Sequence, residues 1–230
     1  MYWQRRQEVN ANNLANVETA GFRAERVFSE ILPGGVPALG TVMDPRAGEL
    51  RETAGPLDIA LQGEGHFAVE TVEGTKLVRS GSFTLDADGR VVDASGNPLL
   101  GTSGPLVLPP GPVEIDASGV VTVAGERVGR LRVVRANEQA NARGVEGGAP
   151  VSSARGSLRD GVLVDESALT DIPEAAVRVR QGFLEGSNVN ALDSLIEMTT
   201  IQRSFEAVQR SVTTIDSMME TISNRLGRVE

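Results

Sequence analysis

The residues that could carry out catalysis or bind a metal are few and widely separated in this sequence. His66, in the stretch GEGHFAV, is the only histidine, and the chain has no cysteine. A zinc site would therefore have to be built from carboxylates alone, which is rare. No G-x-S-x-G elbow is present to position a nucleophilic serine. A lone histidine between glycines at the start of a strand is typical of a structural residue.

Acidic and glycine-rich stretches do not form a recognisable ligand site either. Asp86 and Asp88, in DADG, lack the third ligand and the glutamate at the twelfth position that a calcium loop needs. Gly63 and Gly65 form a G-x-G without a following helix, so a nucleotide loop is not supported. A carbohydrate-active enzyme would need a cleft with two carboxylates, and no such set stands out. The sequence predicts a protein that is not an enzyme and takes no metal or cofactor.

The composition narrows the possible partners. The 230 residues carry a net charge of −9, and no run of Lys or Arg interrupts the acidic balance, so we expect no nucleic-acid partner. No apolar run is long enough to span a membrane, so membrane insertion is not expected. The N-terminal stretch MYWQRRQEVNANN lacks the apolar core of a secretory signal, which predicts that no signal peptide is cleaved.

The periodicity of the sequence divides the chain into four segments and predicts an α+β fold. We expect an N-terminal helix and an extended arm over 1–30, in which Gly21 ends the helix. Residues 31–55 are rich in Gly and Pro and predict an irregular connector. A central all-β domain of short hairpins is expected over 56–181, and a long C-terminal helix over 182–230.

The central domain alternates polar and apolar residues in short runs that are rich in β-branched side chains. Turn signals separate these runs, and in DADG and both DASG stretches Asp precedes Gly, which suits tight turns that end in a left-handed residue. No helix-length pattern separates the runs, so no βαβ alternation is expected. We predict strands within 57–61, 66–72, 76–80, 82–86, 89–93, 105–109, 112–116, 119–123 and 129–134, with further strands near 158–164 and 176–180.

The C-terminal helix has the clearest periodicity in the chain. Asn190 is its expected N-cap, and Asp193 places a favourable charge in its first turn. From Asn190 to Leu226 the helix would be about 55 Å long, at roughly 1.5 Å per residue. Its apolar residues alternate spacings of three and four, as in a coiled coil. This stripe, called the seam below, consists of Met198, Ile201, Phe205, Val208, Val212, Ile215, Met219, Ile222 and Leu226.

The seam needs a cover that the N-terminal helix cannot supply alone. That helix offers only Trp3, Leu14 and Val17 on one stripe. The flanks of the seam are mostly small or uncharged, and small residues let neighbouring helices approach closely. We therefore expect other copies of the chain to cover the seam. A helix hairpin within one chain is the alternative.

Three blocks of the sequence resemble the bacterial flagellar rod and hook proteins. NNLANVETAGFRAERVF (12–28) is similar to the family's N-terminal signature, A-N-N-L-A-N-x-x-T-x-G-F/Y. PLDIALQGEGHFAVET (56–71) and TKLVRSGSFTLDADGRVVDASGNPLLG (75–101) are similar to its strand block. QGFLEGSNVNALDSLIEMTTIQRSFEA (181–207) is similar to its C-terminal block, G-x-L-E-x-S-N-V-N followed by the Q-R-x-[FY]-E helix. The blocks occur in the expected order.

The resemblance implies an axial tube in which the N- and C-terminal helices pair as a coiled coil and the β domain faces outward. Its partners would be other copies of the chain, neighbouring rod and hook proteins, and the flagellar type III export apparatus. An amide near a helix end can cap carbonyls of its own chain or of a neighbour, and a buried amide fixes register. We therefore predict a subunit interface made by the seam together with Asn12, Asn13, Leu14, Asn16, Val17, Asn188 and Asn190, with solvated caps as the alternative role of the amides.

The implied function is that of a structural subunit of the flagellar rod, located in the basal body within the periplasm and exported without a cleaved signal peptide. PLVLPPGPVEIDASGVVTVAGERVGRLRVV (105–134), together with LEGSNVNA, resembles the proximal-rod branch of the family most. The distal-rod and hook-type branches, which usually carry a longer connector than 31–55, are the alternatives. An extracellular β-rich fibre or adhesin on a coiled-coil stalk would explain the architecture but not the paired terminal signatures. The chain begins about two to four turns later than is usual in the family, which predicts a shortened N-terminal helix or a misassigned start. His66 stands where the family often has an apolar residue.

Overall fold

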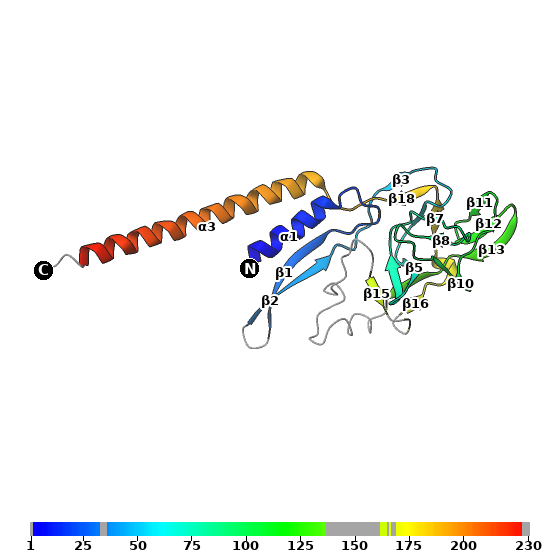
Figure 1. The fold of residues 1–230 in the computed structure, drawn as a ribbon, viewed down its shortest axis with the longest axis horizontal. Helices are drawn as coiled ribbons and strands as arrows, with labels where there is room; N and C mark the ends of the chain where they lie inside the picture. Colours follow the sequence, from blue (N-terminus) through cyan, green and yellow to red (C-terminus); the bar gives the residue numbers. More distant parts are fainter. Residues whose placement is uncertain (1, 33–35, 137–161, 165, 167–168, 227–230) are drawn as a thin grey trace.

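The computed structural model describes residues 2–32, 36–136, 162–164, 166 and 169–226 of the chain. It confirms an α+β fold in which a β domain lies at one end and two helices extend from it in the same direction (Figure 1). The N-terminal helix α1 spans Tyr2–Ala15, and the C-terminal helix α3 spans Ala191–Leu226 and continues far beyond α1. None of the described helices is long and apolar enough to cross a membrane.

The β domain is an assembly of short antiparallel pairs, as the period-two pattern predicted. Its largest sheet has the order β15-β6-β5-β14-β16, and a three-stranded sheet has the order β11-β12-β13. Smaller pairs join β7 with β8, β9 with β10, β4 with β17 and β3 with β18. The strands are β3 Leu50–Glu52, β4 Ile59–Leu61, β5 His66–Thr71, β6 Gly74–Val78, β7 Thr84–Leu85, β8 Val91–Val92, β9 Leu100–Gly101, β10 Gly104–Pro105, β11 Val113–Ile115, β12 Val120–Val123, β13 Glu126–Arg130, β14 Val133–Ala136, β15 Val162–Val164, β16 Leu169–Asp171, β17 Val179–Gln181 and β18 Phe183–Glu185, and a 3₁₀ turn, η3, spans Glu174–Ala176.

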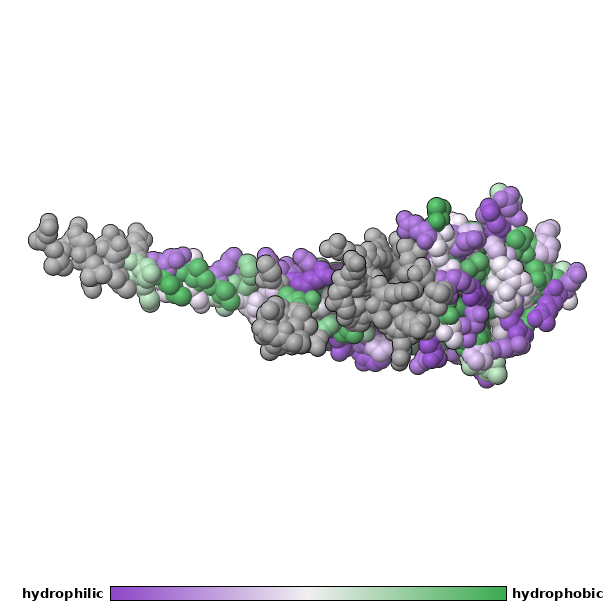
Figure 2. Space-filling view, turned by 90° about the horizontal axis from the view of Figure 1, so that it is seen from below, coloured by the Kyte–Doolittle hydropathy of each residue, from purple (hydrophilic) through white to green (hydrophobic). Residues whose placement is uncertain are grey.

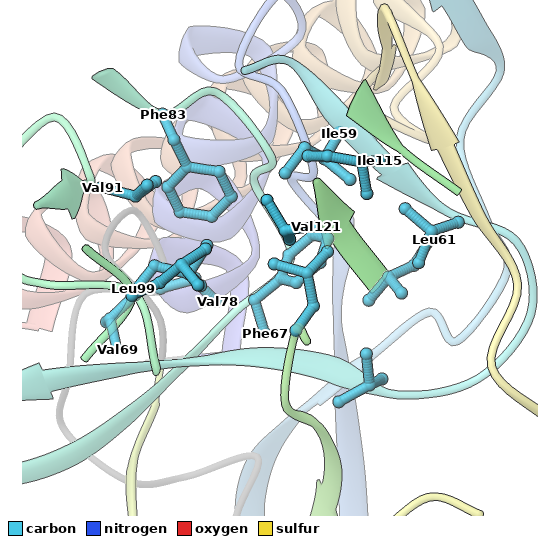
Figure 3. Packing of buried hydrophobic residues seen from close by; sticks show 14 of the residues in the cluster. Ile59, Leu61, Phe67, Val69, Val78, Phe83, Val91, Leu99, Ile115 and Val121 are labelled. Atoms are coloured by element: carbon cyan, nitrogen blue, oxygen red, sulfur yellow. The ribbon is translucent and has the colours of Figure 1, made fainter. Parts of the chain in front are cut away.

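The core of the β domain lies between these sheets and is apolar (Figure 3). The rings of Phe67 and Phe83 meet edge to face with their centroids 5.5 Å apart. Val69 and Leu99 are completely buried beside them, and Val121 enters from the three-stranded sheet. Because the core draws on strands from β4 to β17, the domain is held together by side-chain packing more than by any one sheet.

The Asp-Gly turns have the conformation that the sequence predicted. Gly89, Gly96 and Gly119 have φ of 77°, 82° and 80°, in the left-handed region that favours glycine. In the first turn the Asp86 carboxylate accepts hydrogen bonds from the backbone N–H groups of Asp88 and Arg90. These aspartates therefore stabilise turns.

The segment 31–55 is more regular than the connector that the sequence predicted. It holds the end of β1 (Glu25–Leu32), all of β2 (Val36–Met43) and β3. β1 and β2, of eight residues each, pair antiparallel alongside α1 (Figure 1). The prediction of irregular structure was wrong here. Glycines and prolines hide the alternation that indicates a strand, and β2 is paired by β1.

The helix ends earlier than predicted, at Ala15, and Gly21 is not the residue that stops it. Gly21 has a φ of 71°, but its N–H donates to the carbonyl of Glu185 in β18, at 2.7 Å, and not to the helix. Asn16 ends the helix instead. Its N–H lies 3.1 Å from the carbonyl of Asn13, and its side-chain Nδ2 donates to the carbonyl of Asn12 at 2.8 Å.

Two valines of one hairpin test how far the packed core determines stability. Val69 is completely buried, and Val72 is fully exposed. Val69→Ala removes apolar burial and leaves a cavity, so the free energy of unfolding should fall by about 1.5–3 kcal/mol in urea denaturation. Val72→Ala should change it by less than about 0.5 kcal/mol. Equal losses in the two variants would contradict this description of the core.

Candidate assembly surface

The two helices pack antiparallel over the first turns of α3. The guanidinium of Arg6 donates to the Glu197 carboxylate at 2.7 Å, and the Nδ2 of Asn10 donates to the carbonyl of Ser194 at 2.7 Å. Ile201, a seam residue, is 2% exposed. Because α1 begins at Tyr2 and runs in the opposite direction, its cover ends near this residue.

Beyond Ile201 the seam continues without a cover from the described part of this chain. Phe205, Val208, Val212, Ile215 and Met219 are 46% to 65% exposed. Figure 2 shows apolar side chains gathered along this part of the helix. The side chains of Ile222 and Leu226 lie outside the described ones, although the helix itself continues to Leu226. A soluble monomer rarely exposes so long an apolar stripe, which marks this face as an interaction surface.

The hydroxyl side chains of α3 are bonded within the helix. Thr200 and Ser204 donate to the carbonyls of Ile196 and Thr200, four residues earlier, at 2.8 and 2.9 Å. Thr214 donates in the same way to Arg210 at 2.8 Å. Their hydrogen-bonding capacity is thus partly used up. Ser204 presents a small surface beside the seam, whereas Thr214 lies about 160° around the helix from Val212. Such a flank allows a neighbouring helix to approach without stranding polar groups.

Two of the predicted amides, Asn13 and Asn188, bond to backbone groups where the helices join the β domain. Asn13 makes a two-way contact with the backbone of Glu25, donating to its carbonyl at 2.8 Å and accepting from its N–H at 2.9 Å. Asn188 accepts from the N–H of Ala24 at 2.6 Å and donates to the carbonyls of Asp44 and Arg46 at 3.2 and 2.7 Å. All five of these bonds lie within the chain.

Asn190 is the N-cap of α3, as predicted. Its side-chain oxygen accepts from the N–H of Leu192 at 3.0 Å and lies 3.4 Å from the N–H of Asp193. Asn12 is exposed, and its side-chain oxygen accepts from Asn16 at 3.1 Å. The remaining predicted interface residues, which are partly buried within the chain, are Leu14, Val17 and Met198.

Several residues of this region were not predicted from the sequence. Asn10 is buried, and its spacing of three from Asn13 was a signal that could have found it, since both then face the same side of the helix. Leu192, Leu195 and Ile196 are exposed and lie on a side of α3 away from Ile201. They add apolar surface that the seam pattern does not include.

A buried ion cluster lies where the arm after α1 meets the β domain. The Nε of Arg79 donates to Oε2 of Glu185 at 2.5 Å, and the Nη2 of Arg23 donates to the other oxygen at 2.9 Å. The side chains of Arg79 and Glu185 are 5% and 2% exposed. Neither residue stood out in the sequence, because the strands bring them together from positions far apart in the chain.

His66 lies near this cluster at the start of β5. Its Nδ1 is buried without a hydrogen-bond partner. Burial first, and then the nearby guanidinium groups of Arg79 and Arg23, lower the pKa of His66 to about 4. The imidazole is therefore neutral at pH 7.

No catalytic or metal-binding arrangement emerges from the described residues. They contain no group of three or more His, Asp or Glu side chains that could hold a metal ion. An open groove of about 580 Å³ lies at the start of α3 and is lined by residues such as Arg46, Glu49 and Asn188. The Asn188 side chain in this groove is bonded to backbone groups, and Arg46 and Glu49 are exposed.

Three family models match successive parts of the chain. The model described as "Flagella basal body rod protein" matches residues 3–23, and "Flagellar hook protein FlgE/F/G D1 domain" matches 60–123. "Flagellar basal body rod FlgEFG protein C-terminal" matches 180–225. The matches cover α1, much of the β domain and most of α3, in that order.

Relatives that match over most of this chain are also flagellar basal-body rod proteins. The flagellar basal-body rod protein FlgF of Escherichia coli is 34% identical over 229 residues, covering 91% of this chain and 88% of the relative. FlgF of Caulobacter vibrioides is 26% identical over 100% of this chain and 95% of the relative. The flagellar basal-body rod protein FlgG of Bacillus subtilis is 27% identical over 96% and 94%.

The Asn188 contacts predict a loss of stability in the isolated chain. Asn188→Ala leaves one N–H and two carbonyls without their partner, so the free energy of unfolding should fall by about 2–4 kcal/mol. Asn190→Ala removes only an exposed cap and should cost about 1 kcal/mol. Urea denaturation of the two variants measures the difference. If both cost the same small amount, Asn188 is a simple solvated cap.

The position of His66 predicts a stability that falls on acidification. The folded-state pKa lies below the ordinary value of about 6.5, so the unfolded chain binds the proton more readily in the interval between them. The contribution is fully present above pH 6.5 and is lost as the pH falls through 4. Between pH 7 and pH 5 the chain should lose about 1–2 kcal/mol through this group.

His66→Phe provides the matched control for this titration. The variant has no group that protonates at this position, so its urea midpoint should change less than that of the wild type between pH 7 and pH 5. Parallel pH profiles for the two proteins would show that protonation of His66 is not coupled to folding.

Proposed function

Because this chain belongs to the family of flagellar basal-body rod proteins, we propose that it is built into the rod through the uncovered seam of α3. The chain is a structural subunit of the flagellar rod and not an enzyme. Its FlgF relatives favour the proximal rod, with FlgG-type rod proteins close behind. Its place is the flagellar basal body.

The observation that supports the seam as the assembly surface is its exposure beyond Ile201. Five seam residues in succession, from Phe205 to Met219, are close to half exposed or more in the single chain. In proteins most of the stability of a helix comes from the packing of its apolar face and not from helix propensity alone. Burial of apolar surface is also the main favourable term in protein association. Other copies, or neighbouring axial proteins with the same kind of helix, supply the cover.

The antiparallel contact of α1 with the start of α3 supports the proposal that the helices form the axial part of the rod. In this arrangement a coiled coil continues from the α1–α3 pair into contacts with neighbouring subunits, and the β domain faces outward. The small hydroxyl side chains beside the seam, such as Ser204 and Ser211, bond to their own helix and suit a second close neighbour. On this proposal each α3 packs against more than one partner.

The amides have a role that follows from where their bonds lie. Asn13 and Asn188 bond the arm at 24–25 and the loop at 44–46, within the chain. We therefore assign them to positioning the helices within each subunit, and through that position to the register between subunits. Asn12, Asn16 and Asn190 act at helix ends in the same way.

Export through the flagellar type III apparatus and a periplasmic position within the rod complete the proposed function. The net charge of −9 agrees with an assembly that does not involve nucleic acid.

A single charge placed on the seam tests the assembly surface. Val212 is exposed in the single chain, so Val212→Asp should leave the melting of the isolated protein nearly unchanged. In the assembled rod the same carboxylate would be buried without a partner, at a cost of several kcal/mol in each copy. Incorporation into basal bodies and swimming should both be lost while export continues.

Arg210→Asp is the matched control, since it places the same residue about 160° away around the helix. Cells carrying this variant should still assemble rods and swim. Motility of cells with Val212→Asp, at normal levels of the protein, would refute the seam as the assembly surface.

A further inference from the structure

The buried carboxylate of Glu185 lies at the point where the helical part of the molecule joins the β domain. It ends β18, five residues before the N-cap of α3. One of its oxygens accepts from Arg79, and the other accepts from Arg23 and from the N–H of Gly48, at 3.1 Å. Its backbone carbonyl accepts from the N–H of Gly21. The residue thus bonds to four separate positions of the chain.

These positions belong to every described segment that passes between the helices and the β domain. Gly21 and Arg23 lie on the arm after α1, and Gly48 lies on the return from the β1–β2 hairpin. Glu185 itself lies on the segment that leads to α3. These three segments are called the neck below. One carboxylate bonds to all three, although the first and the last of them are more than 100 residues apart in the sequence.

Arg79 anchors this carboxylate to the β domain. Its guanidinium donates to the carbonyls of Leu61, at 3.0 Å, and Gly63, at 2.7 Å, and also to that of Gly65. Three carbonyls and a carboxylate therefore use four of its five N–H donors, with the side chain 5% exposed. A planar guanidinium held in this way has a single orientation, and it fixes the carboxylate relative to β4 and β5.

The backbone packing around the cluster is equally tight. Gly21 has a φ of 71°, and a Cβ atom there would lie 2.6 Å from the backbone nitrogen of Ser80, the residue after Arg79. A Cβ atom at Gly48 would lie 1.9 Å from the carbonyl oxygen of Gly186, the residue after Glu185. The arm therefore touches the backbone of the β domain at Gly21, and two neck segments touch each other backbone to backbone at Gly48.

From this geometry we infer that Glu185 and Arg79 are positioning residues that lock the helices at one angle to the β domain. Removing one cationic partner from a buried carboxylate is strongly destabilising. The contacts of Glu185 therefore form or break together. Such a joint suits a subunit under mechanical load, because force on the β domain reaches the helices through a rigid connection. The inference concerns the single chain and stands independently of the assembly surface on α3.

Distances between spin labels test the lock in the full-length chain. The protein has no cysteine, so Gln7→Cys on α1 and Ser95→Cys in an exposed turn of the β domain give two specific labels. With Glu185 present, pulsed electron resonance should give one narrow distance distribution. With Glu185→Gln the distribution should broaden or split, and the Gly48 amide should exchange hydrogen about tenfold faster or more.

Glu52→Gln is the matched control, because Glu52 lies on β3 opposite β18 but is exposed. It should leave the distribution narrow. A narrow distribution in Glu185→Gln, or a broad one in the wild type, would overturn the inference.

If Glu185→Gln unfolds the β domain, the variant Arg23→Gln tests the lock instead. This variant removes the side-chain bonds of Arg23 to Glu185 and to the carbonyl of Pro45, and it leaves the Arg79–Glu185 pair in place. Broadening with normal exchange protection of core residues such as Val69 and Val121 would support a lock. An unchanged narrow distribution would overturn it, since the arm would then be fixed without the cluster.

Discussion

The organisation of this protein depends on one mismatch in length. α1 covers α3 only as far as Ile201, but the apolar seam of α3 continues for several more turns. The described residues of a single chain do not bury the rest of that stripe. On the proposed function, the incomplete helix pair leaves this apolar surface for neighbouring subunits to cover.

Two kinds of interaction divide the work within the subunit. The β domain is stabilised by apolar packing around Phe67 and Phe83, and it needs no neighbour. The neck is stabilised by polar groups, namely the amides of Asn13 and Asn188 and the carboxylate of Glu185. Polar contacts are directional, so they fix position and angle better than apolar ones do. Apolar surface is then left for the contact between subunits.

Much of the fold could be predicted from the sequence, because it depends on local periodicity. The period of two predicted the strands of the β domain, and the Asp-Gly pairs predicted turns such as the one at Gly89. The seam and the cap at Asn190 followed from helical spacing. The β1–β2 pair was missed because its glycines and prolines hide the alternation of polar and apolar residues.

The candidate site was predicted less completely, for reasons of sequence separation. The amides were recognised, but their partners were not, because Asn188 bonds to residues 142 to 164 positions away. Arg79 and Glu185 are 106 positions apart and carry no local signal. Whether a polar residue faces a neighbour or its own chain is decided by tertiary packing, and one-dimensional spacing does not contain that information.

Hydrogen exchange along α3, compared between the isolated chain and purified rods, tests the central claim most directly. The account predicts slow exchange over 194–201 in both samples, since α1 covers that part of the helix. Over 205–219 it predicts fast exchange in the isolated chain and slow exchange in the rod. Exchange over 205–219 that is equally fast in the rod would contradict the claim that neighbouring subunits cover the seam.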